Sequence, residues 1–252
     1  MGDGPDAVFF DLDGVITFTA RVHFAAWKEM FDEFLREHAS GERKFDENDY
    51  RAYVDGKPRY DGVLSFLQSR KIQLPYGDPS DSPSALTVCG LGNRKNDFFN
   101  RKVRDSGVDV DQDAVRFVRE LRARDIRTGI ASSSKNAVAI LEGVGIRDLF
   151  EAVVDGVVSE RLKLHGKPQP DIFLQCLAWL REPPQPQRAA VVEDAIAGVE
   201  AGSRGGFGLV LGVDRTNSGE LKEHGANKVI RDFREITVDE VLAFFRDRAR
   251  VA

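Results

Sequence analysis

The sequence of 252 residues has few of the side chains that crosslink a chain or anchor it in a bilayer. Its only cysteines are Cys89 and Cys176, too few for a disulfide framework or a thiolate metal cluster, so we expect two reduced thiols. Its apolar runs are only a few residues long, far short of the ~20 residues that a membrane-spanning helix needs. We therefore expect a soluble protein without a membrane partner.

The sequence also lacks an excess of positive charge. It has 36 basic and 41 acidic residues, a formal net charge of -5, which is unlike the basic surface of a nucleic-acid-binding protein. Its first residues contain neither a basic region nor an apolar stretch, so we expect no signal peptide and a cytoplasmic location. Any bound phosphate must therefore be held by local features and not by the overall field.

Apolar residues make up 42% of the chain, enough for a packed core. Short apolar runs without alternation are typical of strands buried on both faces of a parallel sheet. These runs occupy residues 7–10, 128–131, 189–192 and 209–213. Helical patterns lie between them at residues 113–124, 135–144, 171–180 and 195–202. This alternation predicts an α/β fold with a doubly wound parallel sheet.

The long interval between the first two runs has a different pattern. Apolar residues recur at helical spacing from Val22 to Leu35, and residues 48–53 and 60–70 read as further helices before a loop at 75–83. Such an interval is too long for a loop. We therefore predict a helical domain at 19–105, inserted into a core formed by 1–18 and 106–252. Because ligands of open α/β sheets bind beyond the carboxyl ends of the strands, this domain is expected to act as a cap.

Two carboxylates follow the first apolar run. Asp11 and Asp13 are two residues apart, and Gly14 comes directly after them. Two like charges this close repel each other unless a cation or another partner compensates. Asp and Gly are also common turn residues, but a turn alone does not need two carboxylates at the end of a buried strand. The pattern favours a functional site.

Hydroxyl groups and a lysine follow at later positions. Residues 131–136 read Ala-Ser-Ser-Ser-Lys-Asn at the end of a strand and before a helix, where backbone N–H groups and hydroxyls can hold a phosphate. A serine that merely caps the helix explains this segment equally well. Lys167 lies before Pro168 in a loop, where a lone lysine is usually solvated, so its interpretation depends on the other motifs.

An acidic pair, Glu193 and Asp194, follows the third apolar run. Together with Asp11 and Asp13 it would form a site of oxygen ligands only, which suits Mg²⁺ better than zinc or copper. The pair is also compatible with a simpler role, in which it favours the N-terminus of the next helix through the helix dipole. Four such motifs at successive strand ends are a stronger signal than any one of them.

These four motifs, in this order, resemble those of the haloacid dehalogenase superfamily, whose core is Rossmann-like. The resemblance covers nearly the whole chain, and it implies that Asp11 is a nucleophile that becomes phosphorylated and that Asp13 is the general acid and base. It implies that Ser132, Ser133 and Lys167 bind the transferred phosphoryl group. The implied Mg²⁺ ligands are Asp11, the backbone carbonyl of Asp13, Glu193 and Asp194. Dehalogenases of the superfamily lack the second aspartate and the acidic pair, so we do not expect dehalogenation.

Within the superfamily the chain is most similar to the β-phosphoglucomutase-like subfamily. The resemblance is carried by residues 23–28, by Gly56-x-x-Arg59, by residues 94–97 and by residues 132–136. It implies substrate contacts at His23, Arg59, Lys95, Asn96, Ser134 and Asn136. The chain departs from the subfamily at Phe18, at Asp55 and in a segment that resembles an insertion at residues 75–93. The alternatives are an ordinary histidine on an amphipathic helix for His23 and a solvated surface charge for Arg59.

The resulting hypothesis is a monomeric phosphotransferase acting on a small sugar phosphate, most like the conversion of β-glucose 1-phosphate to glucose 6-phosphate. The alternative is a sugar-phosphate phosphatase, because the two activities share every core residue and differ in whether a sugar hydroxyl or water attacks the phosphorylated aspartate. Arg59 favours the mutase, since a simple phosphatase has no second phosphate to anchor. A remote alternative is a catalytically silent binding domain, which would be expected to lose one of the carboxylates.

Overall fold

The computed structural model describes residues 4–249 of the chain and divides them into two compact units. The core unit consists of the described residues up to Thr17 and from Val110 onward, and the cap unit consists of Phe18–Asp109. The cap unit thus begins one residue before and ends four residues after the predicted 19–105 domain. Within residues 4–249, none of the helices is both long enough and apolar enough to cross a bilayer.

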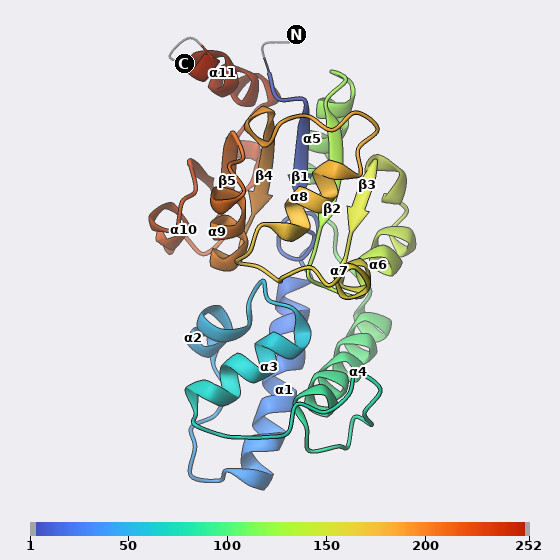
Figure 1. Cartoon of the computed structure of the whole chain (residues 1–252), viewed down its shortest axis with the longest axis vertical. Coiled ribbons are helices and arrows are strands. Elements are labelled where there is room, and N and C mark those ends of the chain that lie inside the picture. Colours follow the sequence, from blue (N-terminus) through green and yellow to red (C-terminus); the bar gives the residue numbers. More distant parts are fainter. Residues whose placement is uncertain (1–3, 250–252) are drawn as a thin grey trace. The chain divides into compact units, whose positions relative to one another are not determined.

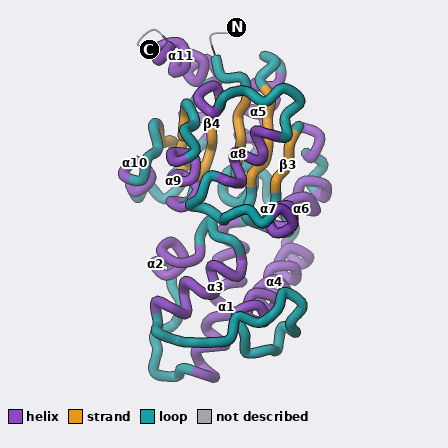
Figure 2. The backbone as a smooth tube through the Cα atoms, in the orientation of Figure 1, coloured by secondary structure: helices purple, strands orange, loops and turns teal. Residues whose placement is uncertain are grey.

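The core unit is built on one parallel sheet of six strands in the order β3-β2-β1-β4-β5-β6 (Figures 1 and 2). This confirms the predicted α/β class and doubly wound sheet. The strands are β1 (Ala7–Phe10), β2 (Arg127–Ala131), β3 (Ala152–Val154), β4 (Ala189–Glu193), β5 (Leu209–Val213) and β6 (Lys228–Ile230). The register pairs Phe10 of β1 with Ile130 of β2 and with Val192 of β4, so these three central strands end at the same edge.

Helices cover both faces of this sheet because successive side chains of a strand point to opposite faces. Phe9 of β1 packs against Phe207 on one face, in a cluster that includes Phe173 of α8, whereas Phe10 packs against Phe117 of α5 on the other. The α-helices of the core unit are α5 (Gln112–Arg122), α6 (Ala137–Gly143), α7 (Gly156–Leu162), α8 (Asp171–Ala178), α9 (Ile196–Arg204), α10 (Glu220–Glu223) and α11 (Val238–Ala249). Short 3₁₀ helices cover Arg147–Leu149, Pro186–Arg188 and Phe233–Glu235.

The cap unit is helical, as predicted. Its α-helices are α1 (Ala20–His38), α2 (Glu47–Asp49), α3 (Arg59–Ser69) and α4 (Val88–Ser106), and a π-helix, η1, covers Tyr50–Val54. The apolar stripe expected in the first helix is buried and includes Trp27, Phe31 and Phe34 of α1. Phe31 packs against Phe66 of α3 with 4.1 Å between ring centroids, so aromatic side chains form the centre of the cap core.

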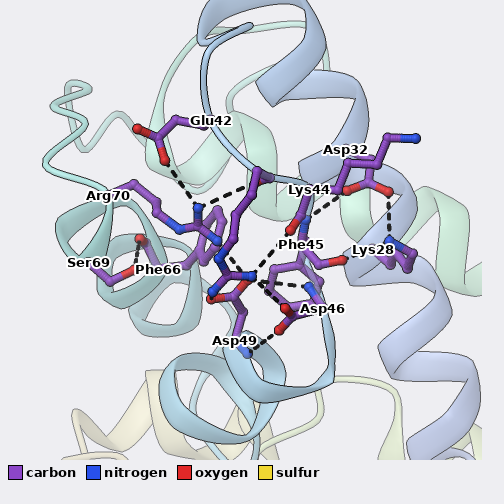
Figure 3. A network of polar contacts seen from close by, with 11 residues as sticks. Lys28, Asp32, Glu42, Lys44, Phe45, Asp46, Asp49, Phe66, Ser69 and Arg70 are labelled. Carbon is purple, nitrogen blue, oxygen red and sulfur yellow. Dashed lines mark hydrogen bonds and ion pairs between the residues drawn. The ribbon is translucent and has the colours of Figure 1, made fainter.

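A polar network fastens the loop after α1 to the rest of the cap (Figure 3). The carboxylate of Asp49, 1% exposed, accepts hydrogen bonds from Arg43 at 2.8 and 2.9 Å and from Arg70 at 2.7 Å. Asp32 of α1 accepts from the backbone N–H of Phe45 at 2.9 Å and from Lys28 at 2.8 Å. These bonds connect α1, the loop, α2 and the C-terminal end of α3.

The segment that resembles an insertion, 75–93, consists of two parts. An irregular loop extends to Thr87, which caps α4 by accepting a hydrogen bond from the Gly90 N–H at 2.9 Å. Residues from Val88 onward belong to α4. Asn93 and Arg94 of this helix donate to carbonyl groups of the loop, including Pro79 at 3.0 Å and Pro83 at 2.8 Å, and thereby fold the loop onto its own helix.

Candidate active site

The carboxyl edge of the central strands brings together the core residues selected from the sequence. Asp11 directly follows β1, Ser132 directly follows β2, and Glu193 is the last residue of β4. Figure 1 shows the arrowheads of β3 and β4 pointing to this same edge. The Asp11 N–H continues the ladder by donating to the Val192 carbonyl at 2.9 Å, and the Ser132 N–H donates to Val154 at 3.0 Å. The ends of buried strands therefore fix where these side chains begin.

Lys167 is the centre of this cluster. Its ammonium group is fully buried and donates to Asp11 Oδ1 at 2.6 Å, to Glu193 Oε1 and to the carbonyl of Ala131 at 3.2 Å. Burial alone lowers the pKa of Lys167, but the Asp11 and Glu193 carboxylates outweigh burial and raise this pKa above its ordinary value. Lys167 is therefore a fixed positive charge beside Asp11, and not the solvated lysine that a loop position suggests.

Asp11 is held at both carboxylate oxygens. Its Oδ2 accepts a hydrogen bond from the backbone N–H of Asp13 at 2.8 Å, while Oδ1 faces Lys167. Burial raises the pKa of Asp11 to about 8; Lys167 opposes this rise, and the Glu193 and Asp13 carboxylates add to it. A further cation at this edge would lower the pKa again and keep Asp11 ionised at neutral pH.

Glu193 organises the turn that follows β4. Its Oε2 accepts from the backbone N–H groups of Asp194 at 3.0 Å and Ala195 at 3.1 Å, and its Oε1 faces Lys167. The acidic pair is thus divided in its contacts: Glu193 holds Lys167 and the turn, and Asp194 lies against Gly14. A Cβ atom on Gly14, whose φ is +93°, would lie 1.8 Å from Asp194 Oδ2, so only glycine lets this carboxylate approach the turn after Asp13.

The donor set at this edge fits a hard divalent cation. The Asp11 carboxylate lies 2.8 Å from the Asp13 N–H, the Asp194 carboxylate lies against Gly14, and both offer oxygen ligands. Among residues 4–249, no three His, Cys, Asp or Glu side chains converge as a preformed metal cage. Mg²⁺ does not require such a cage, because it commonly uses one or two carboxylates and completes its shell with water and substrate phosphate oxygens. Which of the predicted ligands hold Mg²⁺ stays a prediction.

The segment after β2 forms a turn before its helix begins. Ser132 Oγ donates to Asp13 Oδ2 at 3.5 Å and accepts from the Ser134 N–H at 3.1 Å, and Ser134 Oγ accepts from the Asn136 N–H at 3.2 Å. The helix α6 therefore starts at Ala137, two residues after the expected start at Lys135. Ser132 lies near Asp13. The phosphate contacts proposed for Ser132 and Ser133 and the substrate contacts proposed for Ser134 and Asn136 stay predictions.

The cap unit arranges its four selected residues as two pairs. Arg59, at the start of α3, donates from Nη2 to Asn96 Oδ1 of α4 at 2.7 Å. His23 of α1 lies with Nδ1 2.6 Å from Lys95 Nζ and stacks on Phe99 with 4.1 Å between ring centroids. Lys95 is 4% exposed, which differs from a solvated surface lysine. Within this unit Asn96 thus orients Arg59, and His23 and Lys95 form one polar unit.

Sequence reasoning missed Arg215, which follows β5 after Asp214. Its guanidinium donates to the carbonyl of Gly14 at 2.9 Å and to the carboxylate of Asp111 at 2.7 Å. The signal that would have found it is the one that found the other core residues, a polar side chain at the end of a buried apolar run.

Three comparisons place the chain among known proteins. The model of the haloacid dehalogenase-like hydrolase family matches residues 5–206. A β-phosphoglucomutase of Mycobacterium bovis is 44% identical over 239 residues, which cover 91% of this chain and 90% of that protein. A phosphorylated carbohydrates phosphatase of Thermotoga maritima is 26% identical over 230 residues, 90% of this chain and 94% of that protein.

A solved structure shows the same fold. The crystal structure of a β-phosphoglucomutase from Clostridium difficile aligns with a TM-score of 0.79 and 23% sequence identity, over 97% of this chain and 99% of that chain. Because the sequence identity is low, this match supports the arrangement of strands and helices and leaves the substrate to other evidence.

Proposed function

Because the chain belongs to the haloacid dehalogenase-like hydrolase family, we propose that it is a Mg²⁺-dependent phosphotransferase that isomerises a sugar phosphate through phosphorylated Asp11. The observation that carries this proposal is the buried Lys167 ammonium, which lies between the Asp11 and Glu193 carboxylates at the carboxyl edge of the sheet. A nucleophilic carboxylate beside a fixed cation is suited to receive a phosphoryl group, because phosphoryl transfer depends on positioning and charge stabilisation.

The first half-reaction uses two carboxyl groups of one turn. An Asp11 oxygen forms a bond to phosphorus while the bond between phosphorus and the sugar oxygen breaks, and the Asp13 carboxyl gives its proton to the leaving oxygen. Lys167 and the Ser132 region hold the oxygens of the transferred group. Bound Mg²⁺ supplies positive charge that reduces the repulsion between Asp11 and the phosphate dianion.

The second half-reaction restores the protein. A hydroxyl group of the sugar attacks the phosphorus of phosphorylated Asp11 and gives its proton to Asp13, and the Asp11 carboxylate leaves. In the cap, Arg59 is suited to a second phosphate, because a guanidinium binds phosphate with two parallel hydrogen bonds and Asn96 fixes its orientation. A substrate with two anchoring points favours transfer between positions of the same sugar.

The alternative proposal is a sugar-phosphate phosphatase, in which water takes the place of the sugar hydroxyl. The similarity to a phosphorylated carbohydrates phosphatase over 90% of the chain favours it. The choice between the two depends on whether water is excluded from phosphorylated Asp11.

Phosphorus NMR separates these activities directly. The protein is incubated with Mg²⁺, β-glucose 1-phosphate and a trace of glucose 1,6-bisphosphate. We expect glucose 6-phosphate to accumulate with little inorganic phosphate. Inorganic phosphate as the main product would establish the phosphatase instead. No reaction with this substrate, and none with p-nitrophenyl phosphate, would contradict phosphoryl transfer and favour a silent domain.

A further inference from the structure

The turn that carries Asp13 is closed by its own backbone. The N–H groups of Ile16 and Thr17 both donate to the Leu12 carbonyl at 3.0 Å, and the Gly14 N–H donates to the Thr17 carbonyl at 2.7 Å. These bonds engage carbonyl groups at the two ends of the turn. The carbonyls of Gly14 and Val15, in its middle, accept from outside the turn, and both residues are buried.

Arg215 supplies these external donors. Its Nε donates to the Gly14 carbonyl at 2.9 Å and its Nη2 to the Val15 carbonyl at 3.3 Å. Nη2 also donates to Asp111 Oδ2 at 2.7 Å. A guanidinium is planar and presents its donors in a fixed geometry, so two neighbouring carbonyls and one carboxylate define its position closely.

Asp111 is itself firmly held. Its Oδ1 caps α5 by accepting from the N–H groups of Asp113 at 2.9 Å and Ala114 at 3.1 Å, which leaves Oδ2 to face Arg215. Its own N–H donates to the Ile16 carbonyl at 2.9 Å. Arg215 is therefore a rigid connection between the start of α5, the loop after β5 and the turn of Asp13.

We propose that Arg215 is a positioning residue for Asp13, which fixes the turn at Gly14 and Val15 so that the Asp13 carboxyl reaches the leaving oxygen of the substrate. The proposal rests on the proposed function, in which Asp13 is the general acid and base. The same turn lies against Asp194 through Gly14, so a displaced turn changes the surroundings of both carboxylates. Arg215 acts through backbone carbonyls and does not take part in the proton transfer.

The choice of phosphate ester distinguishes the positioning of Asp13 by Arg215 from a purely structural role of Arg215. A sugar oxygen leaves as a strong base and needs a proton from Asp13, whereas dinitrophenolate is a weak base and leaves without one. The kcat/KM value reports the steps up to phosphorylation of Asp11 and is independent of the later dephosphorylation of Asp11. Arg215→Ala should lower kcat/KM for the sugar phosphate by about 100-fold, the lower end of general acid catalysis, and change kcat/KM for 2,4-dinitrophenyl phosphate by less than about threefold.

Three further variants calibrate this measurement. Asp13→Asn should show the same selectivity with a larger loss. Arg215→Lys keeps a positive charge opposite Asp111 but cannot match the planar fork. Its kcat/KM for the sugar phosphate should therefore lie between the values of wild type and Arg215→Ala. Arg215→Lys takes the place of Arg215→Ala in this test if the alanine variant does not fold. Arg122→Ala is the matched control, because Arg122 also donates to a backbone carbonyl, that of Leu149 at 3.0 Å, and we expect it to leave both values unchanged.

The outcomes are distinct. A selective loss with the sugar phosphate supports positioning of Asp13 by Arg215. An equal loss with both esters, or no loss in folded Arg215→Ala or Arg215→Lys, would overturn the role of Arg215 while leaving the proposed function intact. A wild-type protein that turns over neither ester would overturn the proposed function itself, and the role of Arg215 with it.

Discussion

The core and cap units each bury an ionic cluster, and the central groups of the two clusters have opposite charges. In the core, one ammonium group, that of Lys167, lies between the carboxylates of Asp11 and Glu193. In the cap, one carboxylate, that of Asp49, lies between the guanidinium groups of Arg43 and Arg70 (Figure 3). Both clusters are buried at their central group. In the cap, Arg43 and Arg70 also pair with the more exposed carboxylates of Asp46 and Glu42.

This difference separates a structural cluster from a chemical one. The buried Asp49 charge is compensated by cations of the protein, so the cluster holds the loop before α2 to α3 and requires nothing more. In the core, the Lys167 ammonium faces two carboxylates, those of Asp11 and Glu193, and Asp13 and Asp194 lie on the turns that follow them. Such an excess of negative charge favours the binding of a further cation. A buried centre in which carboxylates outnumber the cation therefore indicates where chemistry is to be expected.

The largest expected effect is the loss of turnover in Asp11→Asn. An amide cannot accept the phosphoryl group as a carboxylate does, so we expect kcat with p-nitrophenyl phosphate to fall by at least ~10⁴-fold. Initial rates measure kcat, and a melting curve measures whether the variant keeps its stability. Asp49→Asn is the matched variant in the cap, and it should retain kcat. Comparable losses in both variants would contradict the division between a chemical and a structural cluster.

Lys167→Met should damage both activity and stability. It leaves the Asp11 and Glu193 carboxylates buried without their cation, and breaking a buried pair in this way costs about 3–5 kcal/mol of unfolding free energy. Urea unfolding at pH 8 measures this cost. Because a bound cation would replace part of the lost charge, Mg²⁺ should stabilise this variant more than the wild-type protein. An identical Mg²⁺ response in both proteins would argue against a metal next to Lys167.

Asp49→Asn should lower the free energy of unfolding by about 1–3 kcal/mol, because Arg70 then lacks its buried carboxylate while Asn can still accept a hydrogen bond. The Arg70 side chain is only 9% exposed, whereas that of Arg43 is 55% exposed. Arg43→Ala should therefore cost less than Asp49→Asn, since exposed ion pairs contribute little. Equal losses of unfolding free energy in the two variants, measured by urea unfolding, would show that the exposed Arg43 guanidinium contributes as much stability as the buried carboxylate.

Asp214 is a third kind of buried carboxylate, one that accepts hydrogen bonds from neutral donors. Burial by itself raises the pKa of Asp214, but hydrogen bonds from the Gly219 N–H and the Ser218 and Thr216 hydroxyls outweigh burial and lower this pKa below its ordinary value. Its stabilising contribution is thus complete above the unfolded pKa of about 4 and is lost as the pH falls through the folded value.

Unfolding free energies measured across this acidic window should therefore fall less steeply for Asp214→Asn than for the wild-type protein. At pH 7 the variant should be the less stable of the two, because the amide loses the charge-assisted hydrogen bonds. Parallel pH profiles for the two proteins would show that these donors do not favour the ionised form.

Much of the core was predictable from the sequence because its signals are local. Buried strands appear as apolar runs, and the polar residues that follow them mark the carboxyl edge, as for Asp11 and Glu193. The short strands β3 and β6 were missed. Three residues such as Ala152–Val154 form a strand because the sheet provides a partner, and β6 begins with a lysine.

The helix α4 was missed for a different reason. Its first turns contain Gly90, Gly92 and Asn93, which are poor helix formers. The packing of the cap explains Gly92, because a Cβ atom there would lie 2.7 Å from the Tyr60 ring and push away the start of α3. The contact with Tyr60 thus requires glycine at a helical position where helix propensity alone would disfavour it. The pairing of Arg59 with Asn96 across these two helices also joins residues that are far apart in sequence.

The sequence by itself determined the class of the fold, the strand ends that carry carboxylates and the presence of an inserted helical segment. Periodicity and burial can be inferred from residues that are close together in the sequence. Only the tertiary structure decided that Lys167 is a buried cation, that Glu193 holds Lys167 and a turn, and that Arg215 joins the turn of Asp13 to α5. These roles depend on distances between groups from separate strands and loops, and a linear pattern contains the groups but not the distances.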